Sequence, residues 1–335
     1  ICIFVEMKRK TYLNIIVLIV CYIQLIPAQE ASMERPKYLK KNDTIAILAP
    51  AGIIKNEISI YQAKELAENW GLNVVIGQNV FSKNNHFAGT DAQRLNDFQS
   101  ALDDSSIKAI WCARGGYGTV RIIDQLDFSK FKENPKWIIG YSDITVLHNH
   151  VHNLGFETIH GMMPVNMEFS ESSRKKSVKT LQKVLFGNKL NYSIPSSKYN
   201  KLGNANGIIV GGNLTILENL LGTKSSLDTA NKILFFEEIG EYKYHIDRLI
   251  RALDRNNYFK NCNGLIIGGM SHIKKNNPAF GESIEEIILE ITSKYDFPIV
   301  FNFPAGHDPE NRALLLGREI NLKVTESITE IKFSK

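Results

Sequence analysis

The sequence predicts an α/β protein, with a parallel-sheet domain first and a mixed α/β domain after it. The chain has 335 residues, which exceeds the size at which a single hydrophobic core usually stops growing. Hydrophobic residues make up 44% and charged residues 22%, an ordinary globular composition. Short apolar runs alternate with amphipathic stretches, and this order is typical of a parallel sheet covered by helices.

The first half of the chain carries this alternation most clearly. Apolar runs predict strands at residues 44–49, 74–76, 110–112 and 137–139. Amphipathic stretches predict helices at residues 58–70, 91–102 and from about Asp143 onward, and Gly71 ends the first of them. The order is Rossmann-like in outline, so we expect functional loops at the carboxyl ends of the strands.

A polar segment separates the two halves. Residues 188–206 contain Pro195 and several Asn without apolar periodicity, so we place the domain linker there. The N-terminal domain then spans residues 32–187 and the C-terminal domain residues 207–335. Strands at 207–210, 233–236, 265–267 and 299–301 alternate with helices at 244–253 and 284–295, and residues 314–333 alternate like antiparallel strands.

Residues 1–31 have the layout of a secretory signal with a few upstream residues. Met7 is followed by the basic residues 8–10 and by an apolar run at 15–26, which is short for a membrane span of about 20 residues. Small residues suited to cleavage follow. We therefore expect export to the periplasm without stable membrane anchoring after signal removal; the protein is cytoplasmic if this segment is not a functional signal.

The remaining composition excludes several classes of protein. The net charge of +5 is spread thinly, so nucleic-acid binding is not implied. Beyond the signal only Cys112 and Cys262 remain, without the spacing of a zinc site. His148 and His152 could share a helix face, but Asn149 stands where the zinc-protease motif needs Glu. We expect no metal site.

A serine lies directly between a predicted strand and a predicted helix. Ser142 follows the strand at 137–139 and Gly140, which is the context of a nucleophile elbow. The backbone N–H of Asp143, near the helix N-terminus, can then stabilise an oxyanion. The alternative is that Ser142 merely caps the helix. A nucleophile also needs a base, an orienting carboxylate and a second oxyanion donor.

The glycine loop that follows the strand at 110–112 can supply the second oxyanion donor. We favour the Gly116 amide, with Gly115 as the alternative. A phosphate-binding loop is also compatible with these glycines, although the full dinucleotide fingerprint is absent.

The other two groups follow apolar strands. Glu237 comes straight after the strand at 233–236 and is the candidate orienting carboxylate, whereas we expect Glu238 and Glu241 to be exposed. His307 follows the strand at 299–301 after Gly306, and it is the candidate base.

Together these segments resemble the LD-carboxypeptidases, also called muramoyltetrapeptide carboxypeptidases, and the related microcin C immunity peptidases. The resemblance runs from about residue 41 to residue 321. Its markers are Ala49-Pro50-Ala51-Gly52, Phe87-Ala88-Gly89-Thr90-Asp91 with Arg94, Ala113-Arg114-Gly115-Gly116-Tyr117-Gly118 with Arg121, Gly140-Tyr141-Ser142-Asp143, His160-Gly161, Gly211-Gly212-Asn213-Leu214, Phe236-Glu237-Glu238 and Gly306-His307.

The resemblance implies a fold and a reaction. The fold is a Rossmann-like (flavodoxin-like) domain and a smaller swivelling α/β domain, commonly in a homodimer. The reaction is cofactor-free removal of the terminal D-alanine from tetrapeptide stems of peptidoglycan or muropeptides. The implied triad is Ser142, Glu237 and His307. Arg114 and Arg248 are candidates for binding the terminal carboxylate, and Arg114 could instead brace its own glycine loop.

Two other functions stay open at this point. An immunity peptidase would cleave an aminoacyl-nucleotide conjugate and needs an aromatic platform for the base. Trp70, Trp111 and Trp137 all fall within or beside predicted core elements. The second alternative is a non-catalytic wall-binding protein, against which the intact triad argues.

Overall fold

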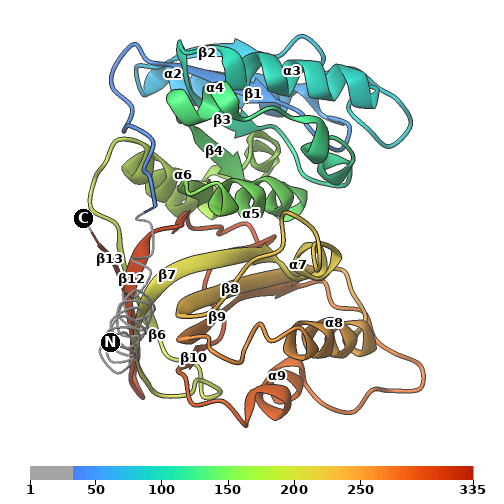
Figure 1. Cartoon of the computed structure of the whole chain (residues 1–335), viewed down its shortest axis with the longest axis vertical. Helices are drawn as coiled ribbons and strands as arrows, with labels where there is room; N and C mark the ends of the chain where they lie inside the picture. The colour runs from blue at the N-terminus through green and yellow to red at the C-terminus, as the bar shows by residue number, and fades with distance from the viewer. Residues whose placement is uncertain (1–32, 335) are drawn as a thin grey trace, which may run out of the picture. The chain divides into compact units, whose positions relative to one another are not determined.

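The computed structural model describes residues 33–334, which form two β-sheets with their helices (Figure 1). The expected signal at residues 1–31 lies outside the described residues. Between residues 33 and 334, no helix combines the length and the hydropathy needed to cross a bilayer. The same part of the chain contains no cluster of three or more His, Cys, Asp or Glu arranged to hold a metal ion.

The first sheet is parallel except at one edge. Its strands are β1 (Thr44–Leu48), β2 (Asn73–Ile76), β3 (Ile107–Cys112), β4 (Trp137–Gly140), β5 (Thr158–His160) and β11 (Leu314–Leu316). They lie in the order β11-β5-β4-β3-β1-β2, and only β11 runs antiparallel to its neighbour. The five parallel strands have the order 2-1-3-4-5 of flavodoxin-like sheets. The predicted fold of the first half is confirmed.

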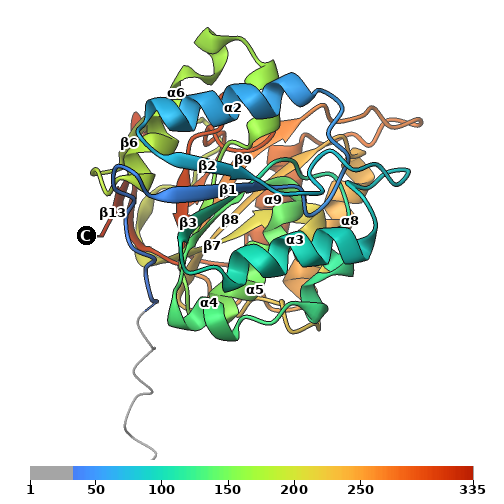
Figure 2. The ribbon, with the colours of Figure 1, turned by 90° about the horizontal axis from the view of Figure 1, so that it is seen from above.

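Helices cover both faces of this sheet. They are α2 (Glu57–Asn69), α3 (Asp91–Asp103), α4 (Ser129–Glu133), α5 (Thr145–Asn153) and α6 (Glu171–Leu185). Figure 2 shows α2 on one face and α3 with α4 on the other. Successive strand residues point to opposite faces, so Ile45 and Ile47 pack in the same core cluster as α2, while Ala46 and Leu48 pack with α3.

The second sheet mixes parallel and antiparallel strands. Its order is β10 (Ile299–Val300), β9 (Gly264–Ser271), β8 (Lys232–Ile239), β7 (Gly203–Asn213), β12 (Glu319–Val324), β13 (Ile328–Phe333) and β6 (Asn191–Pro195). The strands β7 to β10 are parallel, and β12, β13 and β6 are antiparallel. The helices of this part are α7 (Leu214–Asn219), α8 (Lys243–Arg255) and α9 (Ile284–Thr292). The predicted mixed α/β architecture is confirmed.

The segment expected to be an irregular linker, residues 188–206, contains β6 and the first residues of β7. In β6 only Tyr192 and Ile194 face inward, and this single apolar pair is too short a signal to separate an edge strand from a loop. The chain also passes between the two sheets more than once, because β11 pairs with β5 of the first sheet before the chain returns to the second sheet at β12. A buried ion pair between Glu157 and Arg318 fixes the pairing of β11 with β5.

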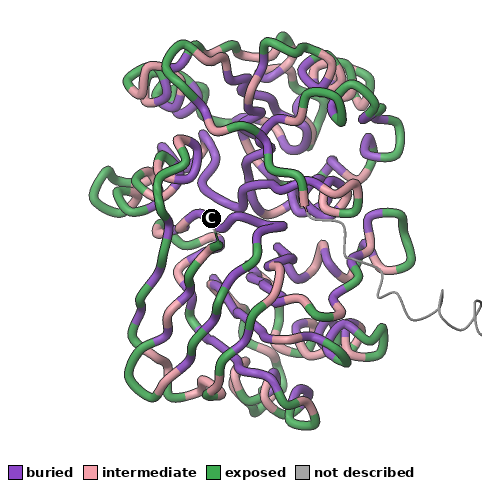
Figure 3. The backbone as a smooth tube through the Cα atoms, turned by 60° about the vertical axis from the view of Figure 1, so that its left-hand side comes forward, coloured by how far each residue is buried: buried purple, intermediate pink, exposed green. Residues whose placement is uncertain are grey.

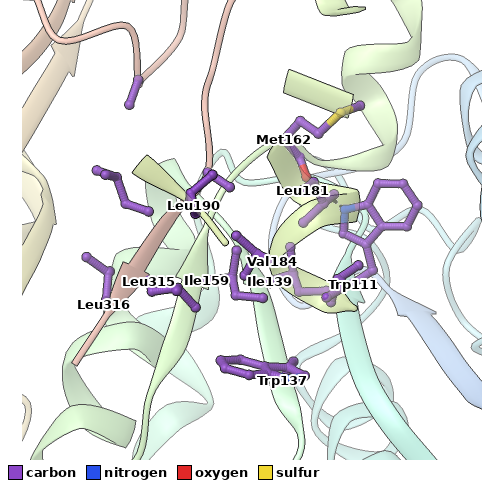
Figure 4. Packing of buried hydrophobic residues seen from close by; sticks show 14 of the residues in the cluster. Trp111, Trp137, Ile139, Ile159, Met162, Leu181, Val184, Leu190, Leu315 and Leu316 are labelled. Carbon is purple, nitrogen blue, oxygen red and sulfur yellow. Dashed lines mark hydrogen bonds between the residues drawn. The ribbon is translucent and has the colours of Figure 1, made fainter. Parts of the chain in front are cut away.

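Buried residues gather along the strands and the inner helix faces, and exposed residues lie on the outer rim (Figure 3). One core cluster includes residues of both sheets. Figure 4 shows Ile139 and Ile159 of the first sheet packed near Leu181 of α6 and Leu315 of β11. This shared core places the carboxyl ends of β4 and β8 in one region of the molecule.

Candidate active site

The candidate nucleophile lies on a strained turn between β4 and α5. Ser142 has a φ of 63° and is the first residue of the short 3-10 helix η3 (Ser142–Ile144). A non-glycine residue in this region costs about 1–3 kcal/mol and marks strand-to-helix nucleophile turns. The residue at the cap position is Tyr141, and no side chain caps this helix. The alternative in which Ser142 is a helix cap is therefore wrong.

Gly140 is required by the closeness of the turn. A Cβ at this position would lie 2.8 Å from the Cγ1 of Ile144, which is far inside van der Waals contact. Glycine therefore lets the helix begin immediately above the end of β4. The sequence context predicts this turn, and in the structure Ser142 is partly buried.

The glycine loop after β3 packs against Ser142. A Cβ on Gly115 would lie 3.0 Å from Ser142 Oγ and 3.2 Å from the Asp143 amide nitrogen. The Gly52 N–H donates to the Gly115 carbonyl at 3.0 Å and fixes the loop from the other side. Gly116 has a φ of 100° and is exposed. The region beside the Ser142 hydroxyl is thus lined by backbone.

Two buried charged side chains hold this loop in place. Asp143 Oδ2 accepts the Thr119 N–H at 2.9 Å. The Arg94 guanidinium donates to the carbonyls of Pro50 (2.6 Å) and Gly118 (2.8 Å). Burial raises the pKa of Asp143, and only its Oδ2 atom has a hydrogen-bond partner within residues 33–334. The loops after β1, β3 and β4 are consequently tied to one another.

His307 and Glu237 form a largely buried pair, although β9 lies between β8, which contains Glu237, and β10, which precedes the loop of His307. His307 Nδ1 lies 2.6 Å from Glu237 Oε2, and the Glu237 side chain is fully buried. Gly306 permits the approach, because a Cβ there would lie 2.9 Å from the same carboxylate oxygen. Burial disfavours the charged imidazole, but the Glu237 carboxylate outweighs it, and the pKa of His307 is raised.

The His307 ring also contacts the nucleophile turn. It packs edge-to-face against Tyr141, the residue before Ser142, with 4.9 Å between ring centroids. The Tyr141 hydroxyl accepts a hydrogen bond from the Asn166 side chain at 2.8 Å. Tyr141 therefore connects His307, the candidate base, to the end of β4. Sequence reasoning gave it no role.

Glu238 is buried, which corrects the expectation that it is exposed. One carboxylate oxygen accepts from the backbone N–H and the hydroxyl of Thr215, at 2.8 and 2.7 Å. The other accepts from Asn213 at 3.1 Å, and Asn213 also donates to Glu237 at 3.3 Å. Burial raises the pKa of Glu238. The Asn213 carboxamide therefore bridges two adjacent carboxylates, a role that its Gly-Gly-Asn-Leu motif does not reveal.

The two arginines proposed for the terminal carboxylate differ in their surroundings. Arg114 is half-buried and donates to the Ile53 carbonyl at 2.6 Å, so it braces the loop after β1. Arg248 is exposed on α8, with its guanidinium 5.6 Å from the centre of the Tyr244 ring.

An open cavity of about 560 Å³ adjoins the base. Its lining includes Pro304 and Asp308 on the loop of His307, and Gly269 and Met270 at the carboxyl end of β9. Asp308 is fixed there by the hydroxyl of Ser271, which donates to it at 2.9 Å. The cavity borders the loop that carries the base, while its lining does not include Ser142, Glu237 or His307.

Comparisons with known proteins agree with this fold. Residues 45–161 match the LD-carboxypeptidase N-terminal domain, and residues 206–322 match the LD-carboxypeptidase C-terminal domain. A probable murein peptide carboxypeptidase of Bacillus subtilis is 32% identical over 302 residues, covering 89% of this chain and 94% of the relative.

Two solved structures have the same fold. The muramoyltetrapeptide carboxypeptidase of Oxalobacter formigenes superposes with a TM-score of 0.78 at 25% identity, covering 87% of this chain and 99% of that one. The microcin C7 self-immunity protein MccF, in complex with aspartyl sulfamoyl adenosine, gives a TM-score of 0.80 at 19% identity, covering 88% and 97%. Since both domain matches lie in order along most of the chain, the protein belongs to the LD-carboxypeptidase family.

Proposed function

We propose that the protein is a serine LD-carboxypeptidase that removes the terminal D-alanine from murein tetrapeptide stems, with Ser142, His307 and Glu237 as its triad. The observation that carries the proposal is the 2.6 Å contact between His307 and the buried Glu237, because the His307 ring also packs against Tyr141, the residue before Ser142. The homologues named for murein peptides support the substrate class.

The proposed reaction has two halves. Ser142 Oγ attacks the carbonyl carbon of the diamino acid while His307 Nε2 takes the hydroxyl proton. Collapse of the tetrahedral intermediate breaks the C–N bond, and His307 returns the proton to the departing D-alanine amine. Water then attacks the acyl-enzyme and loses its proton to His307. The ester C–O bond breaks, and His307 returns this proton to Ser142 Oγ.

The surrounding groups favour this sequence of proton transfers. Glu237 holds Nδ1 and stabilises the imidazolium, which leaves Nε2 to face the nucleophile. Amides of Gly116 and Asp143 would hold the oxyanion, with Gly115 as the alternative donor. The closeness of Gly115 to the Ser142 hydroxyl supports a donor from this loop. The raised pKa of His307 favours its role as the acid that protonates the leaving amine.

A substrate panel tests this proposal. Purified protein lacking residues 1–31 is incubated separately with a disaccharide tetrapeptide and with an aminoacyl sulfamoyl adenosine, and products are identified by mass spectrometry. We expect D-alanine and the tripeptide from the first and no hydrolysis of the second. Hydrolysis of the adenosine conjugate alone would contradict the proposal in favour of an immunity peptidase, and tetrapeptide binding without any product would favour a wall-binding protein.

The cellular location and the oligomeric state of the protein are also proposals. We propose export to the periplasm, on the basic and apolar residues at 8–26, and a homodimer, on the family resemblance. Fractionation of cells that produce the full chain or the chain from residue 32 tests export, and light scattering of the purified protein tests the dimer. Identical fractionation of the two chains, or a monomer at all concentrations, would contradict the respective statement.

A further inference from the structure

The base lies on a loop that has no regular secondary structure. Residues 301–313 connect β10 to β11 and carry His307 between them. The peptide just before His307 is held from two sides: the Gly306 N–H donates to Asn311 Oδ1 at 3.1 Å, and the Ala305 carbonyl accepts the Gly269 N–H at 2.9 Å. The position of His307 therefore depends on these contacts.

Asn311 is itself fixed. It is 2% exposed, and its backbone N–H donates to the Ser177 hydroxyl of α6 at 2.8 Å. The next residue, Arg312, donates its N–H to the Pro304 carbonyl at 2.8 Å and closes the loop. The side chain that holds Gly306 is thus anchored to a helix that packs with the first sheet.

His160 is buried against Tyr141, the ring that His307 also contacts. Its ring is fully buried, with centroids 4.9 Å from Phe235 and 5.9 Å from Tyr141. Within residues 33–334, neither ring nitrogen has a hydrogen-bond partner, and the same holds for Asn311 Nδ2. Burial lowers the pKa of His160 well below its usual range, so the ring stays neutral.

We propose that Asn311 is a positioning residue for His307: its carboxamide oxygen fixes the Ala305–Gly306 peptide, one residue before the base. This inference rests on the proposed function of His307 as the base. Asn311 acts through the Gly306 peptide and does not need to touch the substrate.

Two variants of Asn311 test the proposal through both kinetics and titration. Asn311→Ala removes the acceptor for Gly306, so kcat should fall on the order of 10²-fold with little change in KM, because the base is misplaced. The pKa of His307, followed by NMR of its ring, should fall as its bond to Glu237 loosens. Asn311→Asp keeps the acceptor and adds a negative charge, so it should retain more kcat than Asn311→Ala and should raise the pKa of His307.

A matched control is Asn263→Ala. The Asn263 carboxamide likewise holds backbone groups, here by donating to the carbonyls of Asn206 and Asn231, but it lies at the opposite end of β9 from the site. We expect it to leave kcat and the pKa of His307 unchanged. A folded Asn311→Ala variant with parental kcat and parental His307 titration would overturn the proposal.

The two hypotheses can fail separately. If Asn311→Ala does not fold, Asn311→Leu decides, because it keeps most of the side-chain volume but lacks the acceptor for Gly306; parental kcat and parental His307 titration in that variant overturn the positioning role. The titration requires no substrate. A parent protein that releases no D-alanine would therefore contradict the proposed function, while the NMR shifts would still test the role of Asn311.

Discussion

Substitution of Gly115 by Ala should disable the active site while leaving the fold largely intact. The added methyl group would lie 2.9 Å from Ser142 Cβ and 3.0 Å from its Oγ, where carbon atoms in ordinary contact are about 3.5–4.0 Å apart. Relief therefore requires a displacement of about 0.5–1 Å between the glycine loop and the nucleophile. Such a displacement also moves the Asp143 amide, 3.2 Å from the same methyl group.

The magnitude follows from two effects. Loss of one oxyanion donor costs about 10²–10³-fold in kcat, and a misplaced nucleophile costs on the order of 10²-fold. Because the two effects share one displacement, we expect a total loss of about 10²–10³-fold in D-alanine release. Overpacking should lower the free energy of unfolding by about 1–3 kcal/mol. Gly115 does not have a positive φ, so backbone strain adds nothing.

The control for this experiment is Gly155→Ala. Gly155 has a φ of 94° just after α5, and no atom lies within 4 Å of an added Cβ. It should lose about 1 kcal/mol of stability from backbone strain and retain the parental kcat. Stability is measured by denaturant unfolding and kcat by D-alanine release. A Gly115→Ala variant with kcat within threefold of the Gly155→Ala control would refute the reasoning.

Two further substitutions test the charged pairs. Glu237→Gln removes the carboxylate that raises the pKa of His307, so the acid limb of the kcat/KM profile should move to lower pH and kcat should fall about 10⁴-fold; an unmoved limb would contradict the pairing. Because the pKa of His307 is raised in the folded state, its pairing with Glu237 contributes to the free energy of unfolding at low pH. This contribution is lost as the pH rises through the raised pKa. Glu157→Gln should lower the free energy of unfolding by about 3–5 kcal/mol, because it leaves Arg318 buried without its partner, and should leave kcat unchanged. A loss below about 1 kcal/mol in urea unfolding would show that the pair is not required.

Much of the fold can be predicted because the central strands are continuous apolar runs. The strands β1, β3, β4 and β8 are buried along most of their length, and parallel strands between helices require this pattern. The edge strand β6 could not be predicted in the same way, since its alternate residues face solvent. Nor does the sequence reveal that β11 crosses back to the first sheet, because that pairing depends on contacts far apart in the chain.

Some residues of the candidate site can likewise be predicted from local sequence, whereas others depend on contacts between distant segments. Ser142 and Glu237 can be proposed from local context, because each comes shortly after a run of apolar residues that predicts a strand. The burial of Glu238 cannot be predicted locally, since Thr215 and Asn213 of another segment satisfy its carboxylate. The role of Asn311 cannot be predicted from the sequence either, because its hydrogen bond to the Gly306 N–H forms within an irregular loop.

The central claim is that Ser142 is the nucleophile of an LD-carboxypeptidase. The most direct test compares D-alanine release from a disaccharide tetrapeptide by the parent protein, by Ser142→Ala and by Ser172→Ala, an exposed serine of α6. We expect equal rates for the parent and Ser172→Ala, and a loss on the order of 10⁶-fold for Ser142→Ala, as for removal of a triad serine. D-alanine release by Ser142→Ala at the parental rate would contradict the account.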